Sequence, residues 1–154
     1  MSNIIYNMCY NFKTPDLDFD IFLKAYIIRN KDSSDPKLIN LKKKSDNQYI
    51  LELNKKIPIF LKKLSNTEDI KYSENLYLKD NYIEISCLQT ICGYIFNCNT
   101  TVKYNKEKQR LSLTTLIKID SFPYILEPVL KSYIKKNFDS QREKEQKIIN
   151  NLLE

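Results

Sequence analysis

The residues with the clearest binding chemistry lie in segment 53–66, LNKKIPIFLKKLSN. Lys55 and Lys56 precede a short apolar run, and Lys62 and Lys63 follow it. Ammonium groups near an anionic surface each contribute about 1 kcal/mol of attraction, and the apolar side chains between them suit hydrocarbon. The pattern predicts a segment, residues 57–64, that covers the opening of an apolar cavity or dips into a bilayer. The residues expected to form this lid are Ile57, Pro58, Ile59, Phe60, Leu61 and Leu64.

A plainer interpretation of the same segment is also open. It can form a short amphipathic helix that packs its apolar side on the rest of the protein and leaves its lysines in water.

Catalysis finds little support among the residue types. The chain has no histidine, so the commonest general base and metal ligand is absent. Three glutamates fall in predicted strands: Glu52, Glu74 and Glu84. We expect strand alternation to point their side chains to solvent, so they should not form a catalytic acid–base pair. A chain with one glycine, Gly93, cannot form a glycine-rich phosphate loop. Its cysteines also lack the C-x-x-C spacing that would indicate a metal site. We therefore expect a non-enzymatic protein without cofactor or metal.

Composition indicates one globular domain over residues 1–154. Hydrophobic residues make up 42% of the chain, which is enough for a core at this length. The net charge is +6, which suits anionic partners. Only three of the 25 basic residues are arginines, Arg29, Arg110 and Arg142. We attribute the excess of lysine to a general compositional bias.

Hydrophobic periodicity predicts a strand, a helix, six more strands and a final helix. The first strand covers residues 4–12, and the helix after it has Thr14 as N-cap with Pro15 at the first helical position. The other strands are predicted at 37–43, 48–54, 70–78, 82–90, 94–104 and 110–120. Because their connections are short, we expect an antiparallel meander.

The C-terminal segment changes to helical spacing. Leu126, Leu130, Ile134 and Phe138 recur on one face, and the regular helix is expected to begin at Pro128. The stretch SQREKEQK should continue it as a polar helix. The predicted fold class is α+β: a curved antiparallel sheet wrapped on a long C-terminal helix, a START-like helix-grip arrangement with an internal cavity.

Two cysteines are predicted to face each other. If Cys92 and Gly93 form a two-residue turn, Cys87 and Cys98 lie directly opposite on adjacent strands. A disulfide and a pair of buried thiols both fit this arrangement, and thiols are favoured.

The run KIPIFLKKL…YSENLYLKDNYIEISCLQTICGYIFNCNTTVKY resembles the PRELI-like (slowmo-type) family of mitochondrial phospholipid carriers. Pro58 and Phe60 match its Pro-x-aromatic lid, and Glu74 and Tyr104 match its internal Glu and the Tyr that ends a later strand. The segments YNFKTPDLDFDIFLKAY and YIKKNFDSQREK resemble its first strand and helix and its last helix. The layout covers nearly the whole chain.

The resemblance implies where a lipid phosphate would bind. The matching positions are Lys55 and Lys56 before the lid, and Gln141 and Lys144 on the last helix. Lys37 stands where members often carry His. Lys24 matches the start of a basic-Tyr-Pro-Asn motif that here lacks the proline.

The resemblance also implies a function. It predicts non-enzymatic transfer of phosphatidic acid or phosphatidylserine at anionic membrane surfaces of the mitochondrial intermembrane space, with a small cysteine-paired helical protein as partner. An alternative is a START-like carrier of another apolar ligand, such as a sterol, quinone or isoprenoid. A nucleic-acid or protein-interaction module is disfavoured, because the lysines are scattered and no aromatic-glycine signature accompanies them.

Overall fold

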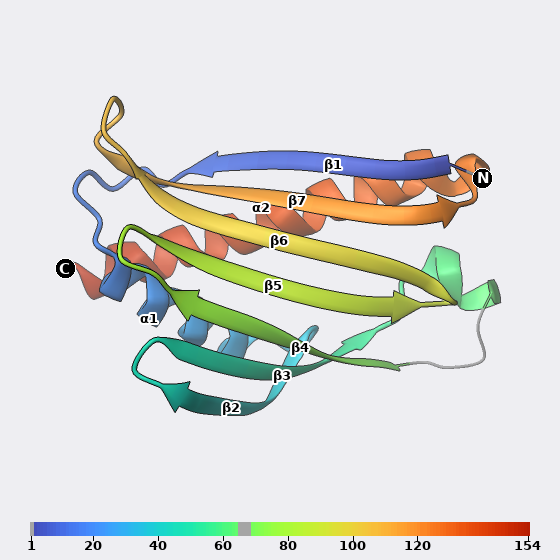
Figure 1. Cartoon of the computed structure of the whole chain (residues 1–154), viewed down its shortest axis with the longest axis horizontal. Coiled ribbons are helices and arrows are strands. Elements are labelled where there is room, and N and C mark those ends of the chain that lie inside the picture. The colour runs from blue at the N-terminus through green and yellow to red at the C-terminus, as the bar shows by residue number, and fades with distance from the viewer. Residues whose placement is uncertain (1, 65–68) are drawn as a thin grey trace.

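The computed structural model describes residues 2–64 and 69–154, and within them a seven-stranded antiparallel sheet carries two helices. The strands follow the order β1-β7-β6-β5-β4-β3-β2, so the meander runs from β2 to β7 and the first strand closes on the last. Both helices lie on the same side of the sheet (Figure 1). The strands are β1 (Ser2–Asn11), β2 (Lys37–Ser45), β3 (Gln48–Lys56), β4 (Asp69–Leu78), β5 (Tyr82–Ile91), β6 (Tyr94–Asn105) and β7 (Arg110–Phe122).

The predicted hairpin at the chain's only glycine is present. Ile91 pairs with Tyr94, and the two residues between them, Cys92 and Gly93, have φ values of 54° and 83°. Two successive left-handed residues match the twist of flanking antiparallel strands, and glycine adopts this conformation without steric cost. The turn fixes the register that places Cys87 opposite Cys98.

The first helix, α1, spans Phe19–Asp32 and begins later than predicted. Asp18, not Thr14, is its N-cap: the Asp18 carboxylate accepts a hydrogen bond from the Ile21 amide at 2.8 Å. Asp16 adopts a left-handed backbone (φ 56°), which no α-helix can include. Its amide donates to the Gln109 carbonyl at the β6–β7 hairpin, so this segment is held by the sheet instead of opening the helix.

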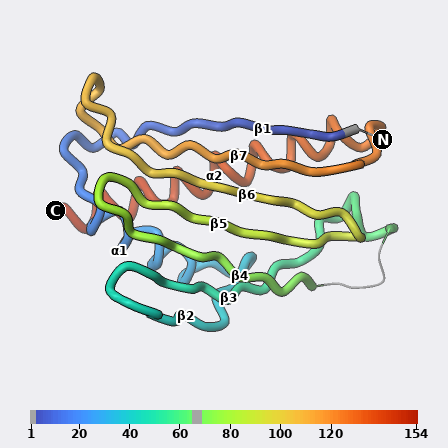
Figure 2. Tube along the Cα trace, in the orientation of Figure 1, coloured from blue at the N-terminus to red at the C-terminus, as the bar shows by residue number. Residues whose placement is uncertain are grey.

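The second helix, α2, spans Glu127–Leu152 and follows a short 3₁₀ helix, η2, at Tyr124–Leu126. Pro128 lies in its first turn, as predicted. The helix runs diagonally behind the sheet along nearly its whole length (Figure 2). Leu130, Ile134 and Phe138 are buried.

The stretch SQREKEQK was predicted as a polar helix; it is helical, and one of its faces is buried. Arg142, Glu145, Gln146 and Ile149 are all buried. They continue the stripe of Leu130, Ile134 and Phe138 at spacings of three and four residues, so the same helix face is apolar first and then charged.

None of the helices in the described part of the chain is long and apolar enough to cross a membrane.

Candidate ligand-binding cavity

A cavity of about 300 Å³ lies between the sheet and the two helices. This volume is about twice that of an engineered apolar cavity that binds benzene, and it falls at the lower end of the range for small-molecule sites. Its walls come from β1, β3 to β7, α1, α2, the segment before β2 and the lid. The predicted internal cavity is therefore present.

The cavity has an apolar part and a polar part. The apolar part is lined by residues of a buried hydrophobic cluster that also includes Ile57 and Leu61 of the lid. The polar part lies where α1 approaches α2. Its apolar walls include Leu61, Ile91, Phe96, Ile117, Leu130 and Ile134, and its polar walls include Tyr26, Arg29, Glu74, Thr100, Thr115 and Arg142.

The two lysines before the lid lie on opposite faces of β3. Lys55 lines the cavity, and its Nζ sits 5.1 Å from the centre of the Tyr133 ring. Lys56 is exposed and lies outside the cavity wall. Successive strand side chains alternate between faces, and Lys55 shares the inward face of Leu51 and Leu53. Of this pair, Lys55 alone could contact a ligand in the cavity.

The other four predicted head-group residues divide in the same way. Gln141 and Lys144 on α2 line the cavity, and Lys144 is exposed. Lys24 is exposed on α1 and Lys37 is exposed at the start of β2, and neither lines the cavity. Their role in binding stays a prediction.

The lid segment contains the 3₁₀ helix η1, Ile59–Leu64. Pro58 and Leu61 are buried and line the cavity, and Ile57 is buried beside them. Phe60 packs edge-on against Tyr133 of α2, with ring centres 5.7 Å apart. The segment therefore closes one side of the cavity with its apolar face, an arrangement that both the lid and the amphipathic-helix interpretations describe.

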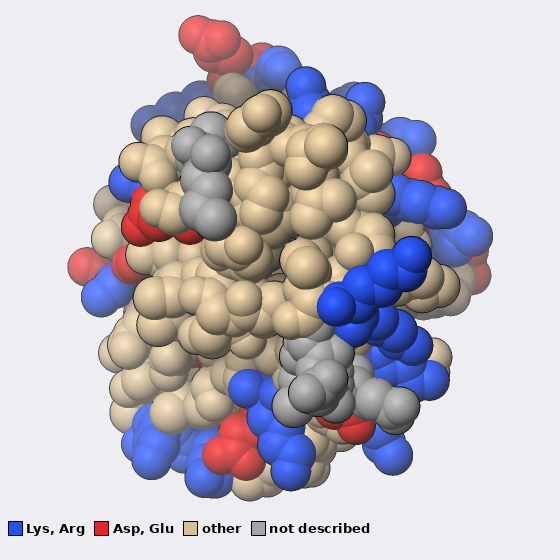
Figure 3. Space-filling view, turned by 90° about the vertical axis from the view of Figure 1, so that its right-hand side faces the viewer, with Lys and Arg blue, Asp and Glu red and all other residues tan. Residues whose placement is uncertain are grey.

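The outer face of η1 is exposed and partly apolar: Ile59 is 83% exposed and Leu64 is 52% exposed. Lys62 and Lys63 are exposed in the same helix. η2 lies at the same end of the molecule (Figure 1) and exposes two more large apolar side chains. Seen from this end, the middle of the surface is largely uncharged and most Lys and Arg side chains lie around it (Figure 3).

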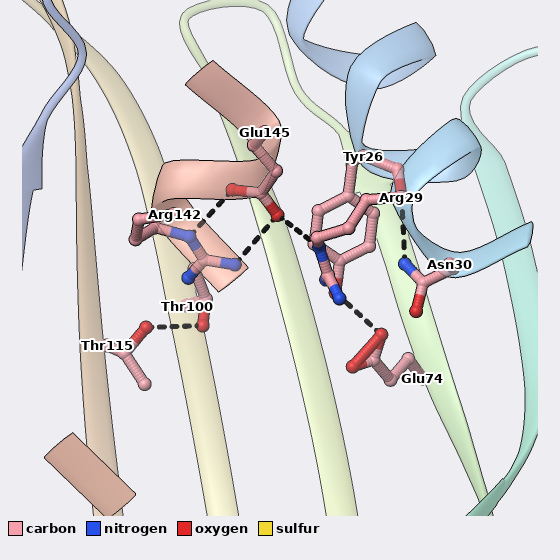
Figure 4. A network of polar contacts seen from close by, with 8 residues as sticks. All are labelled: Tyr26, Arg29, Asn30, Glu74, Thr100, Thr115, Arg142 and Glu145. Atoms are coloured by element: carbon pink, nitrogen blue, oxygen red, sulfur yellow. Dashed lines mark hydrogen bonds and ion pairs between the residues drawn. The ribbon is translucent and has the colours of Figure 1, made fainter. Parts of the chain in front are cut away.

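The polar part of the cavity is built around a buried carboxylate between two arginines (Figure 4). Glu145 Oε2 accepts from Arg29 Nε at 2.7 Å, and Glu145 Oε1 accepts from Arg142 Nε at 2.6 Å. Arg142 Nη2 also donates to Glu145 Oε2 at 2.8 Å. The relative exposures of Arg29, Arg142 and Glu145 are 5%, 4% and 0%.

A second carboxylate, Glu74 on β4, faces this cluster. Its Oε1 accepts a hydrogen bond of 2.6 Å from the Tyr26 hydroxyl. Loss of water around the carboxylate raises the pKa of Glu74, an effect that the Tyr26 hydrogen bond and Arg29 partly oppose. Glu74 is only half-buried, because it lines the hollow. We expected it to point to solvent, and that was wrong.

The two arginines keep donors for another acceptor. Among the described residues, both Nη atoms of Arg29 and Nη1 of Arg142 have no hydrogen-bond partner. Each of these nitrogens keeps some accessible surface. The fully buried side-chain atoms without a hydrogen-bond partner, among the described residues, are Tyr6 Oη and Asn54 Oδ1. Both arginines line the cavity, which places their free donors at its wall.

Sequence reasoning missed this cluster although two signals for it were present. Arginine is scarce in a lysine-rich chain, and two of the three arginines, Arg29 and Arg142, are the buried ones. Arg differs from Lys in its planar fork of donors, so an Arg in a lysine-rich chain indicates a position where a point charge does not suffice. On β4, Glu74 shares its strand face with Ile70, Tyr72 and Leu76, so alternation already placed it inward.

The paired cysteines also line the cavity, and both are free thiols in the structure. The hydrogen bond from Cys87 lowers the pKa of Cys98, and Lys55 lowers it further. The hydrogen bond with Cys98 and burial together raise the pKa of Cys87. In the described residues, no group of three or more His, Cys, Asp or Glu side chains converges to hold a metal ion.

Solved structures with the same architecture identify the fold class. A conserved protein from Geobacillus kaustophilus has a TM-score of 0.60 at 14% identity, covering 96% of each chain. A protein from Thermus thermophilus has a TM-score of 0.61 at 8% identity, covering 97% of this chain and 99% of its own. Ara h 8.0201 has a TM-score of 0.59 at 6% identity with the same coverage. The chain therefore has a helix-grip fold, as predicted.

No protein-family model matches the chain. No curated protein matches its sequence. The resemblance to the PRELI-like family accordingly stays a prediction.

Proposed function

We propose that the chain is a non-enzymatic carrier that holds one amphipathic small molecule between its sheet and its long helix. The observation that carries this proposal is the cavity itself, closed by an apolar lid segment on one side and lined by buried arginines on the other. Interiors of folded proteins are close-packed. A cavity of about 300 Å³ in a 154-residue chain therefore supports a ligand-binding role.

Size limits the occupant. A two-tailed phospholipid carries roughly thirty methylenes, and if each is about as large as a water molecule the tails need on the order of 900 Å³. The cavity offers about a third of this volume. A single-chain or small-ring amphiphile fits the space as it stands.

Filling the cavity should test the proposal. In Ile134→Trp, the larger side chain replaces a residue of the cavity wall, whereas Lys135→Trp adds the same ring on the exposed face of α2. Native mass spectrometry of the wild type and Lys135→Trp should show a one-to-one small-molecule adduct, which Ile134→Trp should lose. An adduct of equal occupancy in Ile134→Trp, with circular dichroism confirming the fold of both variants, would place the ligand elsewhere.

The finer candidate is transfer of phosphatidic acid or phosphatidylserine between anionic membranes. The exposed apolar side chains on η1 and η2, flanked by lysines, support it, because apolar residues beside basic ones favour binding to anionic bilayers. Under this proposal the lid opens and the cavity widens to admit two tails. The residues involved are Ile59, Lys62, Lys63, Leu64, Tyr124 and Ile125.

This candidate includes the rest of what the PRELI-like resemblance implies. The protein would work in the mitochondrial intermembrane space, beside a small cysteine-paired helical partner. Its test is lipid transfer between vesicles: Ile59→Asp should abolish transfer, and Ile39→Asp, at an exposed isoleucine on β2, should not. Extraction of a single-chain amphiphile without any diacyl lipid would reject it in favour of the coarser proposal.

A further inference from the structure

We propose that the polar end of the cavity binds an acidic group of the ligand, a carboxylate or phosphate monoester, through Arg29 and Arg142. The inference rests on the proposed carrier function and names its ligand class: a single-chain or small-ring acid, bound with its acid group beside the arginines and its apolar body toward the lid.

Charge balance at the cluster supports an anionic ligand. Two guanidinium groups share one fully buried carboxylate, Glu145. Burying a charge without a partner is costly, so the second positive charge needs another anion nearby. Glu74 can supply it when ionised, but its Oε1 accepts from Tyr26 and no hydrogen bond joins it to either arginine among the described residues. An acid group on the ligand can therefore supply the second negative charge beside the two arginines.

The free donors are of the kind that an acid group requires. Arg29 offers two Nη atoms and Arg142 offers Nη1, all on side chains that are at least nine-tenths buried and that line the cavity. Planar guanidinium groups match the two oxygens of a carboxylate or phosphate. Glu145 fixes both planes, and each guanidinium also lies near an aromatic ring: Arg29 is 4.9 Å from that of Tyr26, and Arg142 is 5.1 Å from that of Phe138. The donors are preorganised, which reduces the cost of binding.

An ionised Glu74 would compete with the ligand's acid group for the same two arginines. Ligand binding should therefore favour the protonated form of Glu74, and the complex should take up a proton as it forms. The part-buried hydrogen bond from Tyr26 should hold Glu74 in place in either state. The titratable and charged groups around Glu74 are Tyr26 and Arg29 on α1, Arg142 and Glu145 on α2, Tyr72 on its own strand, Cys87 on β5 and Cys98 on β6.

Matched ligands test the inference on the unaltered protein. Decanoate, decyl phosphate and decanol share one apolar chain and differ in the end group. Isothermal titration calorimetry at neutral pH should show at least one of the acids binding about tenfold or more tightly than decanol. Equal affinities for the acids and the alcohol would overturn the acid site and leave the carrier proposal standing. Binding of none of the three would count against the carrier proposal itself.

Variants locate the site. Arg142→Lys keeps the charge and loses the fork, and should reduce the preference for the acid about tenfold. Lys135→Ala removes a cation from the exposed face of α2, outside the cavity wall, and should leave the preference unchanged. If Lys55→Ala loses the preference and Arg142→Lys keeps it, the acid group binds at Lys55, and the inference is refuted.

A pH series gives a readout that a purely structural cluster would not produce. Decanoate stays ionised from about pH 5.5 to about pH 8.5. In the wild type its affinity should fall as pH rises and Glu74 loses its proton. Glu74→Gln, which keeps the acceptor for Tyr26, should bind decanoate with an affinity that hardly varies over this range. The same pH dependence in both proteins would exclude Glu74 and the proposed competition.

Discussion

Arg29 Nε lies 2.7 Å from Glu145 Oε2, and both side chains are almost completely buried. The pair joins α1 to α2 across 116 residues of sequence. Because Glu145 also accepts two hydrogen bonds from Arg142, one carboxylate holds both arginines in the cavity wall. A buried ion pair adds little net stability, but removing one partner is costly, since it leaves the other charge without compensation.

Glu145→Gln should therefore destabilise the fold severely. It leaves two buried guanidinium groups without their carboxylate, and we expect a loss of about 3–5 kcal/mol in the free energy of unfolding. Urea denaturation measures this loss. The control is Glu143→Gln, an exposed position on the same helix, which should change the free energy by less than about 0.5 kcal/mol. Similar values for the two variants would show that the cluster does not hold the helices.

Lys55 and Lys56 should differ in their effect on ligand association. Lys55 faces the cavity and Lys56 faces solvent away from it. A cation at the rim attracts an approaching anion, so Lys55→Ala should lower the association rate of decanoate about threefold at low salt, and added salt should shrink the difference. Stopped-flow measurements check this. Lys56→Ala should behave as the wild type, and an equal effect of both substitutions would point to net charge alone.

Cys98 should be the more reactive of the two cavity thiols. The hydrogen bond from Cys87 lowers the pKa of Cys98, so more of it is thiolate at a given pH, and the thiolate is the nucleophile. In a Cys9→Ser background, which removes the exposed cysteine, limited iodoacetamide treatment should modify Cys98 before Cys87. Peptide mass mapping reads the order. Faster modification of Cys87 would show that Cys87, not Cys98, is the thiol with the lowered pKa.

Glu74 should make the protein less stable as the pH rises. Its pKa is raised in the fold, chiefly by desolvation, so the native state binds a proton that the unfolded chain gives up. The stability from this group is complete below the unfolded pKa, about 4.3, and is lost as pH rises through the higher native pKa.

Glu74→Gln removes that titration and keeps the acceptor for Tyr26. Relative to the variant, the wild type should lose free energy of unfolding as pH increases from about 4.3. Urea denaturation at a series of pH values compares the two proteins. A difference that does not change with pH would show that Glu74 titrates alike in the folded and unfolded chain.

Asp18→Ala should cost about 1 kcal/mol of stability, the usual value of an N-cap side chain. The Asp18 carboxylate accepts from the amide of Ile21 at the start of α1. Asp18→Asn keeps an acceptor at the same position and should retain most of that stability in thermal denaturation. Equal losses in both variants would assign the effect to the negative charge at the helix N-terminus.

Local patterns in the sequence determined most of the fold. Alternation placed the seven strands to within two residues of their observed ends, and the pair Cys92–Gly93 fixed one hairpin and its register. Short connections implied the antiparallel meander, and apolar residues three and four apart implied the long final helix. These features depend on neighbours within a few residues of each other. The start of α1 could not be found in this way, because Asp16 is held by a backbone contact with Gln109 on a distant hairpin.

The tertiary structure alone decided where the charged side chains gather. Nothing local to Arg29, Glu74, Arg142 or Glu145 shows that three elements bring them together in one hollow, and a charge remains buried only when a distant partner compensates it. From the sequence we favoured Lys55 and Lys56, because residue type alone does not distinguish an exposed cation from a buried one. Strand alternation then separates Lys55 from Lys56. Packing of α1 and α2 on the sheet turns Arg29 and Arg142 inward, since each helix face must follow the surface against which it packs.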